Sequence, residues 1–358
     1  MFKVTSSMAV PAMVLKTWGG RPCYCKAMKR RRADLPIHLV LIAIVAMTLL
    51  PFVFVINNSL RRTSETYHSF FGVPAALSNL VRFTWYELSG QEQRIQLRVM
   101  PEVEKGRPQR VRAADVPLTQ LSYATAARQC WNELHRSFGY AWQIFRPYMI
   151  NSLIVSISSA LGVVLVASLS AYVFSRYRFP GHRALFLVIL SFMMIPGVLT
   201  LVPSFLWVKQ LGLINSYWVL ILPYVAGGQI IAIFLMKGFF DGLPQELFES
   251  ARLDGAGHLQ QYWHIVLPLS RQILAVVVIV NILGTWNNFL WPQIANPDQN
   301  YAVVSTGLYL MSQTQAQAAG DASTMFAAYV ISAIPLLILF VYATKPFMTG
   351  VTSGAFKA

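Results

Sequence analysis

The most specific pattern of residue types in this sequence lies in a polar segment, residues 241–268, between two long apolar stretches. Pro244 suits the first turn of a helix, and Glu246 and Glu249 follow it near the positive end of the helix dipole. Small and apolar residues recur at helical spacing: Leu243, Leu247, Ser250, Ala251 and Asp254. Small side chains let another surface approach closely, so non-covalent docking is the chemistry that this face would allow.

The second half of the segment predicts a sharp turn and another helix. Gly255 would end the first helix, since glycine accepts the backbone conformations of an abrupt turn. A short helix is expected from about His258 to Leu267, where Pro268 would stop it. By periodicity alone, a surface helix–turn–helix without a partner explains the segment better than a docking element does.

The spacing of this segment resembles the cytoplasmic "EAA" loop of ATP-binding-cassette (ABC) importer permeases of the binding-protein-dependent, MetI-like family. The family pattern is Glu-Ala-Ala, three residues, Gly, nine residues, and then Ile-x-Leu-Pro, and this chain keeps that spacing. The matching residues are Glu249, Ser250, Ala251, Gly255, Ile265, Leu267 and Pro268, and Asp254 and Ala256 fit the sugar-importer variety. Ser250 departs from the pattern, but it replaces one small residue by another. The resemblance implies that loop 241–268 couples the chain to a cytoplasmic ATPase.

Polar residues inside the apolar stretches form a second set of candidates, because such side chains are costly in lipid unless they face protein or water. The fifth stretch contains the candidate translocation path: Asn281, Thr285, Trp286, Asn287 and Asn288. Hydrogen bonding between helices explains these residues as well as a polar path does. Neutral and aromatic groups suit an uncharged sugar better than an ion. Residues 286–292 also resemble the family's W-N-D-F-x-x-P, with Asn288 where an acid is common.

The C-terminal tail resembles the ending of G-type permease subunits in carbohydrate importers of the maltose class. In that class the tail reaches toward the ATPase dimer, which would involve Gly350, Thr352, Gly354 and Lys357 here. The resemblance covers roughly residues 147–358 and the first apolar stretch, but it has no clear counterpart for residues 61–147.

No catalytic constellation accompanies these patterns. The histidines His38, His182, His258 and His264 lie at expected membrane edges or in the polar segment, without a carboxylate at metal-binding spacing. The three cysteines form neither a disulfide framework nor a metal motif. The sequence also lacks Gly-x4-Gly-Lys-Ser/Thr, the loop that cradles nucleotide phosphates. We therefore expect no enzyme activity, metal or cofactor in this chain; the resemblance assigns ATP and Mg²⁺ to a partner ATPase.

The composition predicts the elements that hold these residues. Of 358 residues, 55% are hydrophobic and 12% charged, against about 25% charged in soluble domains. Six uncharged stretches reach the roughly 20 residues that a membrane-spanning helix needs: about Leu39–Leu60, Tyr148–Ser175, Ala184–Val208, Leu211–Met236, Gln272–Ile294 and Ala322–Thr344. The expected fold is an all-α integral membrane protein with six transmembrane helices, a MetI-like permease core and a large external insertion after the first helix. A soluble enzyme is excluded.

Charge distribution predicts the orientation. The net charge is +15, but no basic stripe interleaved with aromatic residues indicates nucleic-acid binding. With a cytoplasmic N-terminus, the short inner loops and the tail receive Arg176, Arg178, Arg183, Lys237, Arg252, Arg271, Lys345 and Lys357, and the short outer loops only Lys209. This asymmetry follows the positive-inside rule and puts both termini inside. The expected division is a cytoplasmic tail (1–33), transmembrane helix 1 (34–60), an external insertion (61–147), a five-helix core with the coupling loop (148–347) and a cytoplasmic tail (348–358).

Taken together, the resemblance implies a permease subunit of an ATP-driven, binding-protein-dependent carbohydrate importer in a bacterial inner membrane. Its implied partners are a second homologous permease, a dimer of ABC ATPases, an external or periplasmic solute-binding protein, a carbohydrate and the lipid bilayer. Two alternatives stay open: a stand-alone secondary carrier or channel for a neutral polar solute, and a receptor that uses the insertion as a sensor. Neither alternative explains the spacing from Glu249 to Pro268.

Overall fold

The computed structural model describes residues 30–62, 65, 71–89, 95–98, 118–318 and 322–355. It divides into two units, residues 1–52 and 53–358, and the second holds loop 241–268 and the candidate path. The first unit contains most of α1 (Arg30–Ser59), whose side chains from Ile37 to Phe52 are all exposed. A helix that is apolar on every side and exposed on every side is typical of lipid contact.

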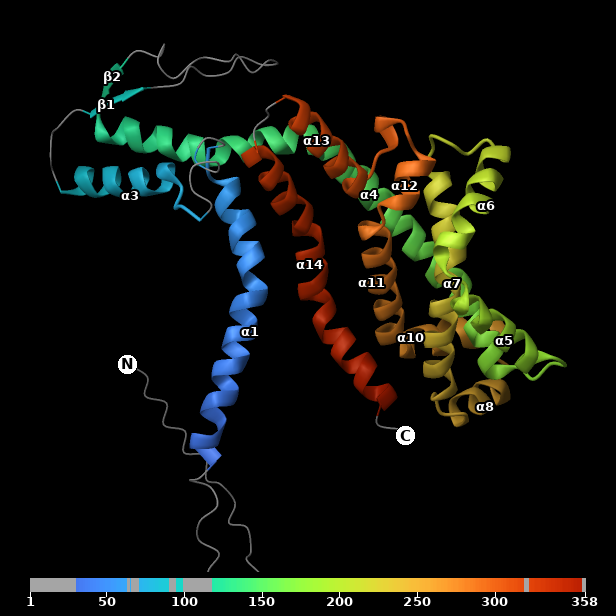
Figure 1. The fold of residues 1–358 in the computed structure, drawn as a ribbon. Coiled ribbons are helices and arrows are strands. Elements are labelled where there is room, and N and C mark those ends of the chain that lie inside the picture. The colour runs from blue at the N-terminus through green and yellow to red at the C-terminus, as the bar shows by residue number, and fades with distance from the viewer. Residues whose placement is uncertain are drawn as a thin grey trace, which may run out of the picture. The chain divides into compact units, whose positions relative to one another are not determined.

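The second unit is built almost entirely of helices (Figure 1). Its long helices are α4 (Tyr123–Arg176), α7 (Trp218–Asp241) and α14 (Ala322–Ala355). Two helix pairs are bent: His182–Met194 meets Gly197–Gln210 at 99°, and His258–Leu269 meets Arg271–Asn287 at 77°. In the described part of the chain, four helices including α1 are long and apolar enough to cross a membrane, or up to six if each bent pair is one span. The chain is therefore a multi-pass, helical membrane protein.

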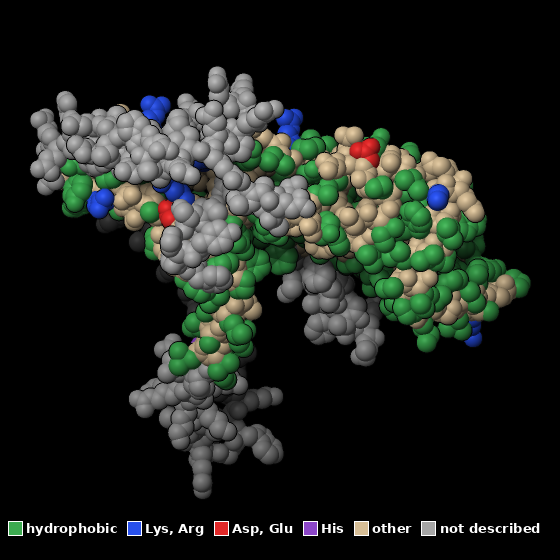
Figure 2. Space-filling view, turned by 45° about the horizontal axis from the view of Figure 1, so that its top comes forward, with side chains coloured by type: hydrophobic (Ala, Val, Ile, Leu, Met, Phe, Trp, Pro, Cys, Tyr) green, Lys and Arg blue, Asp and Glu red, His purple; other side chains and the backbone are tan. Residues whose placement is uncertain are grey.

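Shorter elements complete this unit. Strands β1 (Ile95–Arg98) and β2 (Leu118–Leu121) pair antiparallel, with Ile95 opposite Leu121. The helical elements are α3 (Ala75–Leu88), α5 (His182–Ser191), η2 (Phe192–Met194), α6 (Gly197–Gln210), α8 (Glu246–Leu253), α9 (His258–Gln261), η3 (Tyr262–Val266), α10 (Leu267–Leu269), α11 (Arg271–Asn287), α12 (Leu290–Ala295), η4 (Gln299–Tyr301) and α13 (Val304–Ala318). Figure 2 shows hydrophobic side chains over much of the described surface, with few charged ones among them.

The second helix begins much earlier than the apolar stretch predicted. Instead of starting near Tyr148, α4 starts at Tyr123, where the backbone N–H of Thr125 donates to the Ser122 hydroxyl at 3.4 Å. The early part of α4 has charged residues on its exposed face, which end the apolar run without ending the helix. Its other face carries a helical series of buried residues: Ala126, Cys130, Leu134, Ala141 and Phe145. The segment expected as an external insertion thus includes a helical extension of the second span.

Three other predicted spans differ in their limits. The stretch Ala184–Val208 is broken at Pro196, where α5 and η2 end before α6 begins. Helix α7 starts at Trp218, after a turn in which Gly212 has φ 68° and Asn215 has φ 56°. Helix α11 ends at Asn287, and α12 follows it separately. Helix α13 was not predicted, because its sequence alternates polar and apolar residues without a long apolar run.

The core of the second unit lies around α4, which packs against α7, α11 and α14. Alanines on the buried face of α4 allow this close approach: Ala160, Ala167 and Ala171 are all at most 2% exposed. Gly228 of α7 packs closely against α4, because a Cβ atom added there would lie 2.6 Å from Val163 Cγ2 of α4. The walls that position both candidate sites are therefore tightly packed.

Candidate functional site

Loop 241–268 folds as two helical pieces joined by a turn. Helix α8 covers the first piece, as its helical spacing predicts. The second piece runs through α9, η3 and α10 and ends at Leu269, so the prediction that Pro268 would stop it is wrong. The π-helical turn η3 explains the difference. The Leu267 N–H donates to Tyr262 O, five residues back, so the backbone hydrogen bonds have already left the α-helical pattern just before Pro268, which has no N–H to donate.

The turn between the two pieces depends on Gly255. Its φ is 81°, a left-handed conformation that strains any residue with a Cβ atom. The N–H of Gly255 donates to Arg252 O at 3.0 Å, and the N–H of Ala256 donates to Ala251 O at 2.8 Å. These two bonds form a Schellman motif, which satisfies carbonyls at the end of α8. The predicted need for glycine at this position is confirmed.

Arg176, at the end of α4, holds the first piece of the loop. Its Nη2 donates to the carbonyl oxygens of Phe240 at 2.7 Å and Leu243 at 3.1 Å. The guanidinium carbon lies 4.0 Å from the ring centre of Phe248, the only residue of α8 that is fully buried among those described. Charge assistance and stacking make this a specific attachment. From the sequence, Arg176 counts only as an inner-loop charge, because no nearby residue indicates its contacts.

Two tyrosines hold the second piece. Tyr262, 2% exposed, lies with its hydroxyl 2.7 Å from the Ser168 hydroxyl of α4. One turn further along α4, the Tyr172 hydroxyl donates to His258 O at 3.3 Å. Gln261 adds an internal bond from its Nε2 to Ala256 O at 2.9 Å. Both pieces of the loop are therefore tied to consecutive turns of α4.

The opposite side of the loop faces outward. Among the residues that match the family spacing, Glu249, Ser250, Asp254, Gly255 and Pro268 are exposed, and Ala251, Ala256, Ile265 and Leu267 are half-buried. Large apolar side chains are also exposed: Leu253 is 90% exposed, and Leu259 and Trp263 are more than half exposed. An outer face with small and apolar residues suits close contact with another protein surface.

A cleft of about 330 Å³ lies between α4, α7 and α11, and its mainly apolar lining includes a few polar side chains. Asn281, Thr285 and Asn288 line it, and these are three of the five residues in the candidate translocation path. The other two lie elsewhere: Trp286 is buried in a cluster with residues of α13 and α14, and Asn287 is exposed with its Nδ2 donating to Leu283 O at 2.9 Å. The structure thus separates the five residues into two groups.

Unpaired polar atoms mark this cleft. The hydroxyl oxygen of Tyr224 and Oδ1 of Asn281 are buried without a hydrogen-bond partner among the described residues. Both residues line the cleft, whereas the Thr285 hydroxyl is paired with that of Ser156 at 3.0 Å. Buried polar groups are normally hydrogen bonded, so a bound solute or water would satisfy these two. Tyr224 was not among the predicted path residues, although a tyrosine close to Gly227 and Gly228 in an apolar stretch is a usable signal.

The remaining candidates lie at the C-terminus. Gly350, Thr352 and Gly354 belong to the last turns of α14, and Lys357 lies outside the described residues. Their suggested contact with an ATPase stays a prediction. Among the described residues, no group of three or more His, Cys, Asp or Glu side chains is arranged to hold a metal ion.

Comparisons with known proteins agree with this arrangement. Residues 163–347, which include both loop 241–268 and the cleft, match the model of the family "Binding-protein-dependent transport system inner membrane component". The chain is 35% identical over 210 residues to the diacetylchitobiose uptake system permease protein NgcG of Streptomyces coelicolor, covering 59% of this chain and 69% of NgcG. It is 32% identical over 216 residues to the maltodextrin transport system permease protein MalD of Streptococcus pneumoniae, covering 60% and 76%.

Two further similarities extend this comparison. The sn-glycerol-3-phosphate transport system permease protein UgpE of Yersinia pestis is 31% identical over 220 residues, covering 62% of this chain and 77% of UgpE. The structure also resembles a crystal structure of a bacterial ABC transporter involved in the import of the acidic polysaccharide alginate, with a TM-score of 0.63 and 17% identity. That similarity covers 91% of this chain and 100% of the other chain, and it concerns the fold alone.

Proposed function

Because the chain belongs to the family of inner membrane components of binding-protein-dependent transport systems, we propose that it is one permease subunit of an ATP-driven carbohydrate importer. Loop 241–268 would dock on an ATPase. The observation that carries this proposal is the loop itself: a Glu249-to-Pro268 spacing held on α4 from one side, with a small and apolar face exposed on the other. The exposed apolar side chains Leu253, Leu259 and Trp263 would be covered by such a partner.

The proposed complex has four kinds of component. A second homologous permease would complete the translocation path, two ABC ATPases would bind ATP and Mg²⁺, and an external solute-binding protein would deliver the substrate. The basic residues of the short loops support a cytoplasmic position for both termini and for loop 241–268. The C-terminal residues from Gly350 to Lys357 would extend toward the ATPases. The membrane would be the inner membrane of a bacterial cell.

A carbohydrate is the proposed substrate because the cleft presents neutral hydrogen-bonding groups. Asn281 Oδ1 accepts hydrogen bonds, and the Tyr224 hydroxyl can donate or accept one. Sugars carry many hydroxyl groups that complement both. NgcG and MalD are named for the uptake of oligosaccharides, which agrees with this substrate class. UgpE is named for a phosphorylated polyol, so a binding screen should include sugars and sugar phosphates.

Coupling would follow from the attachments of the loop. Closure of two ATPases around ATP would displace the docked loop, and a bistable helix arrangement would convert that displacement into opening of the path. The contacts of Arg176, Tyr172 and Ser168 would carry the displacement into α4.

The test is to purify the tagged chain from membranes with its associated subunits, comparing Ala251→Trp with the matched small variant Ala251→Ser. Ala251→Trp should reach wild-type abundance in the membrane, yet lose co-purified ATPase and ATP-driven sugar uptake, because the large side chain holds the two surfaces apart. Ala251→Ser should retain both. Wild-type uptake by Ala251→Trp would show that the loop does not transmit the energy. Uptake driven by an ion gradient without ATP would instead support a secondary carrier.

A further inference from the structure

Helix α3 carries two apolar faces, of which only one is covered. Phe83, 1% exposed, and Ala76, 7% exposed, pack toward the start of α4. There Phe83 meets Tyr123, Ala126 and Cys130 of that helix. This contact uses one side of α3 and explains why the helix lies along α4.

The second apolar face of α3 is exposed. Its members are Leu77 (38%), Val81 (62%), Trp85 (69%) and Leu88 (85%), where the percentages are exposed fractions. At 100° per residue these four fall within an arc of about 80°. The centre of that arc lies roughly opposite Phe83, so the stripe faces away from α4.

The stripe points in a defined direction relative to the spans. Figure 1 shows α3 lying along the first part of α4, on the side toward which α14 runs. In this view α3 runs across the direction of α14, and it lies at the level where α14 begins, far from α8 and loop 241–268. Because the stripe faces away from α4, it faces the layer that α14 crosses. That layer is the bilayer.

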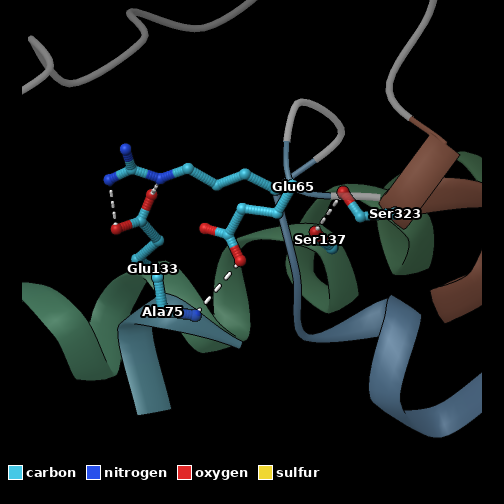
Figure 3. A network of polar contacts seen from close by, with 6 residues as sticks. Glu65, Ala75, Glu133, Ser137 and Ser323 are labelled. Carbon is cyan, nitrogen blue, oxygen red and sulfur yellow. Dashed lines mark hydrogen bonds and ion pairs between the residues drawn. The ribbon is translucent and has the colours of Figure 1, made fainter. Parts of the chain in front are cut away.

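Helix α3 and the part of α4 that it lies along form an arm, and polar contacts fix its geometry near the start of α14 (Figure 3). Arg62 forms an ion pair with Glu133 of α4, and this hydrogen bond raises the pKa of the guanidinium above its ordinary value. The Glu65 carboxylate accepts a hydrogen bond from the Ala75 N–H at 3.1 Å, at the first residue of α3. The hydroxyls of Ser137 on α4 and Ser323 on α14 are 3.2 Å apart. Helices α3, α4 and α14 are therefore tied together around one point.

Aromatic contacts link the segment just before α3 to α14. Phe71 and Val73, just before α3, are 67% and 69% exposed. The Phe71 ring packs edge-on against Phe54 at 5.6 Å, and Phe54 packs against Phe326 of α14 at 5.8 Å. These ring contacts link the exposed segment just before α3 to a helix that is long and apolar enough to cross a membrane.

We propose that α3 is an interfacial helix, which lies in the plane of the membrane at the end of the spans opposite the coupling loop. Leu77, Val81, Trp85 and Leu88 insert among the lipid chains just below the headgroups. A helix with an apolar stripe containing Trp, lying across the direction of the spans, has the form of a membrane-surface anchor. Arg82 is exposed on the neighbouring face of α3, where its Nη2 donates to Asn79 Oδ1 at 3.2 Å.

The direction of the stripe favours lipid over a soluble protein. A solute-binding protein would approach the arm from the solvent side, whereas the stripe faces the side of the spans. The helix therefore holds the arm at a fixed height, so that the solvent-facing side of α4 is presented to such a partner. This role goes beyond the proposed transport function and does not depend on it.

The experiment measures immersion depth with nitroxide spin labels on the full-length chain in vesicles of phosphatidylethanolamine and phosphatidylglycerol. Cys23 and Cys25 are replaced by serine and the buried Cys130 by alanine. Single cysteines for labelling then replace Val81, Trp85 or, as a control on the outward side of α4, the exposed Asn132. Leu77→Cys substitutes for either stripe variant that fails to insert.

Stripe labels should be more accessible to oxygen than to a water-soluble nickel chelate, and the control label should show the opposite order. Equal nickel accessibility of the stripe and the control would place α3 in water and overturn the proposal. Stripe labels that are immobilised and protected from both reagents would show that a protein surface covers the stripe, either a second copy or another subunit, and would also overturn it. Because no transport is measured, failure of this proposal is distinct from failure of the importer assignment.

Discussion

Arg176 should be the side chain whose loss separates loop 241–268 from α4 with the least damage to the fold. Arg176→Leu removes two hydrogen bonds, to the carbonyl oxygens of Phe240 and Leu243, and uncovers the ring of Phe248. The side chain sits at the end of α4 and at the edge of the core, so the helix packing around Val163 and Met236 does not depend on it. We therefore expect local opening of α8 rather than unfolding.

The size of the effect follows from these contacts. Hydrogen bonds that involve a charged group contribute about 1.5–3 kcal/mol each, and a cation–π contact adds about 0.5–1 kcal/mol. The total must be reduced, because the guanidinium is only half-buried and the freed carbonyls become accessible to water. A local cost of about 2 kcal/mol is a reasonable expectation, which corresponds to a roughly 30-fold larger population of the detached loop.

Hydrogen exchange of backbone amides between residues 246 and 257 measures this population directly. Arg176→Leu should exchange faster there by up to the same factor, and it should co-purify less ATPase at unchanged membrane abundance. Arg176→Lys should be intermediate, since a lysine keeps the charge but loses the planar fork and the stacking. Arg178→Leu is the matched control, because Arg178 is an exposed residue of the same charge only two positions away.

Two results would refute this reasoning. Unchanged exchange in Arg176→Leu would show that Tyr172 and Ser168 hold the loop without the arginine. Equal effects of Arg176→Leu and Arg178→Leu would show that positive charge near the loop matters, and that the two hydrogen bonds do not.

Two other predictions concern the turn and the cleft. Gly255→Ala should slow ATP-driven uptake, because an alanine at φ 81° costs about 1 kcal/mol or more. The control Gly257→Ala should leave uptake unchanged, because Gly257 has φ −69° and only the Gln260 side chain lies near the added Cβ. Equal uptake in both variants would contradict the requirement for glycine in the turn. Asn281→Leu and Tyr224→Phe should lower sugar uptake while ATPase co-purification stays at the wild-type level. Normal sugar uptake by both cleft variants would show that the cleft is not on the path.

Local sequence pattern was sufficient for the features that depend on neighbouring residues. The family spacing from Glu249 to Pro268 and the turn at Gly255 need only chain geometry, and both helical pieces are present. Six apolar stretches correctly indicated a multi-pass helical protein, because lipid-facing residues are apolar wherever they lie in the sequence. The start of α4 was not predicted, because its early residues are charged on one face and interrupt the apolar run. The buried residues on the opposite face keep a helical spacing back to Tyr123.

The helical spacing of the candidate path residues distinguishes those that line the cleft from those that do not. Asn281, Thr285 and Asn288 are spaced by four and three residues, so they share one side of the chain at α11 and its end, and all three line the cleft. Trp286 and Asn287 fall on other sides by the same arithmetic. The contacts of Arg176 are different: they join α4 to residues more than 60 positions away, and no pattern within either segment encodes such a pairing.

The connections of the loop explain why a push on it would alter the cleft. Helix α8 follows α7 after only a few residues, and α10 leads into α11 through a 77° bend at Ser270. The two halves of the loop are therefore extensions of the two helices that face each other across the cleft, while α4 forms the wall between them. Val163, which lines the cleft, and Arg176, which holds the loop, are separated by about 20 Å of continuous α4 helix. A docked partner that moved the two halves of the loop by different amounts would move α7 against α11, and the unpaired Tyr224 and Asn281 oxygens lie on those two helices.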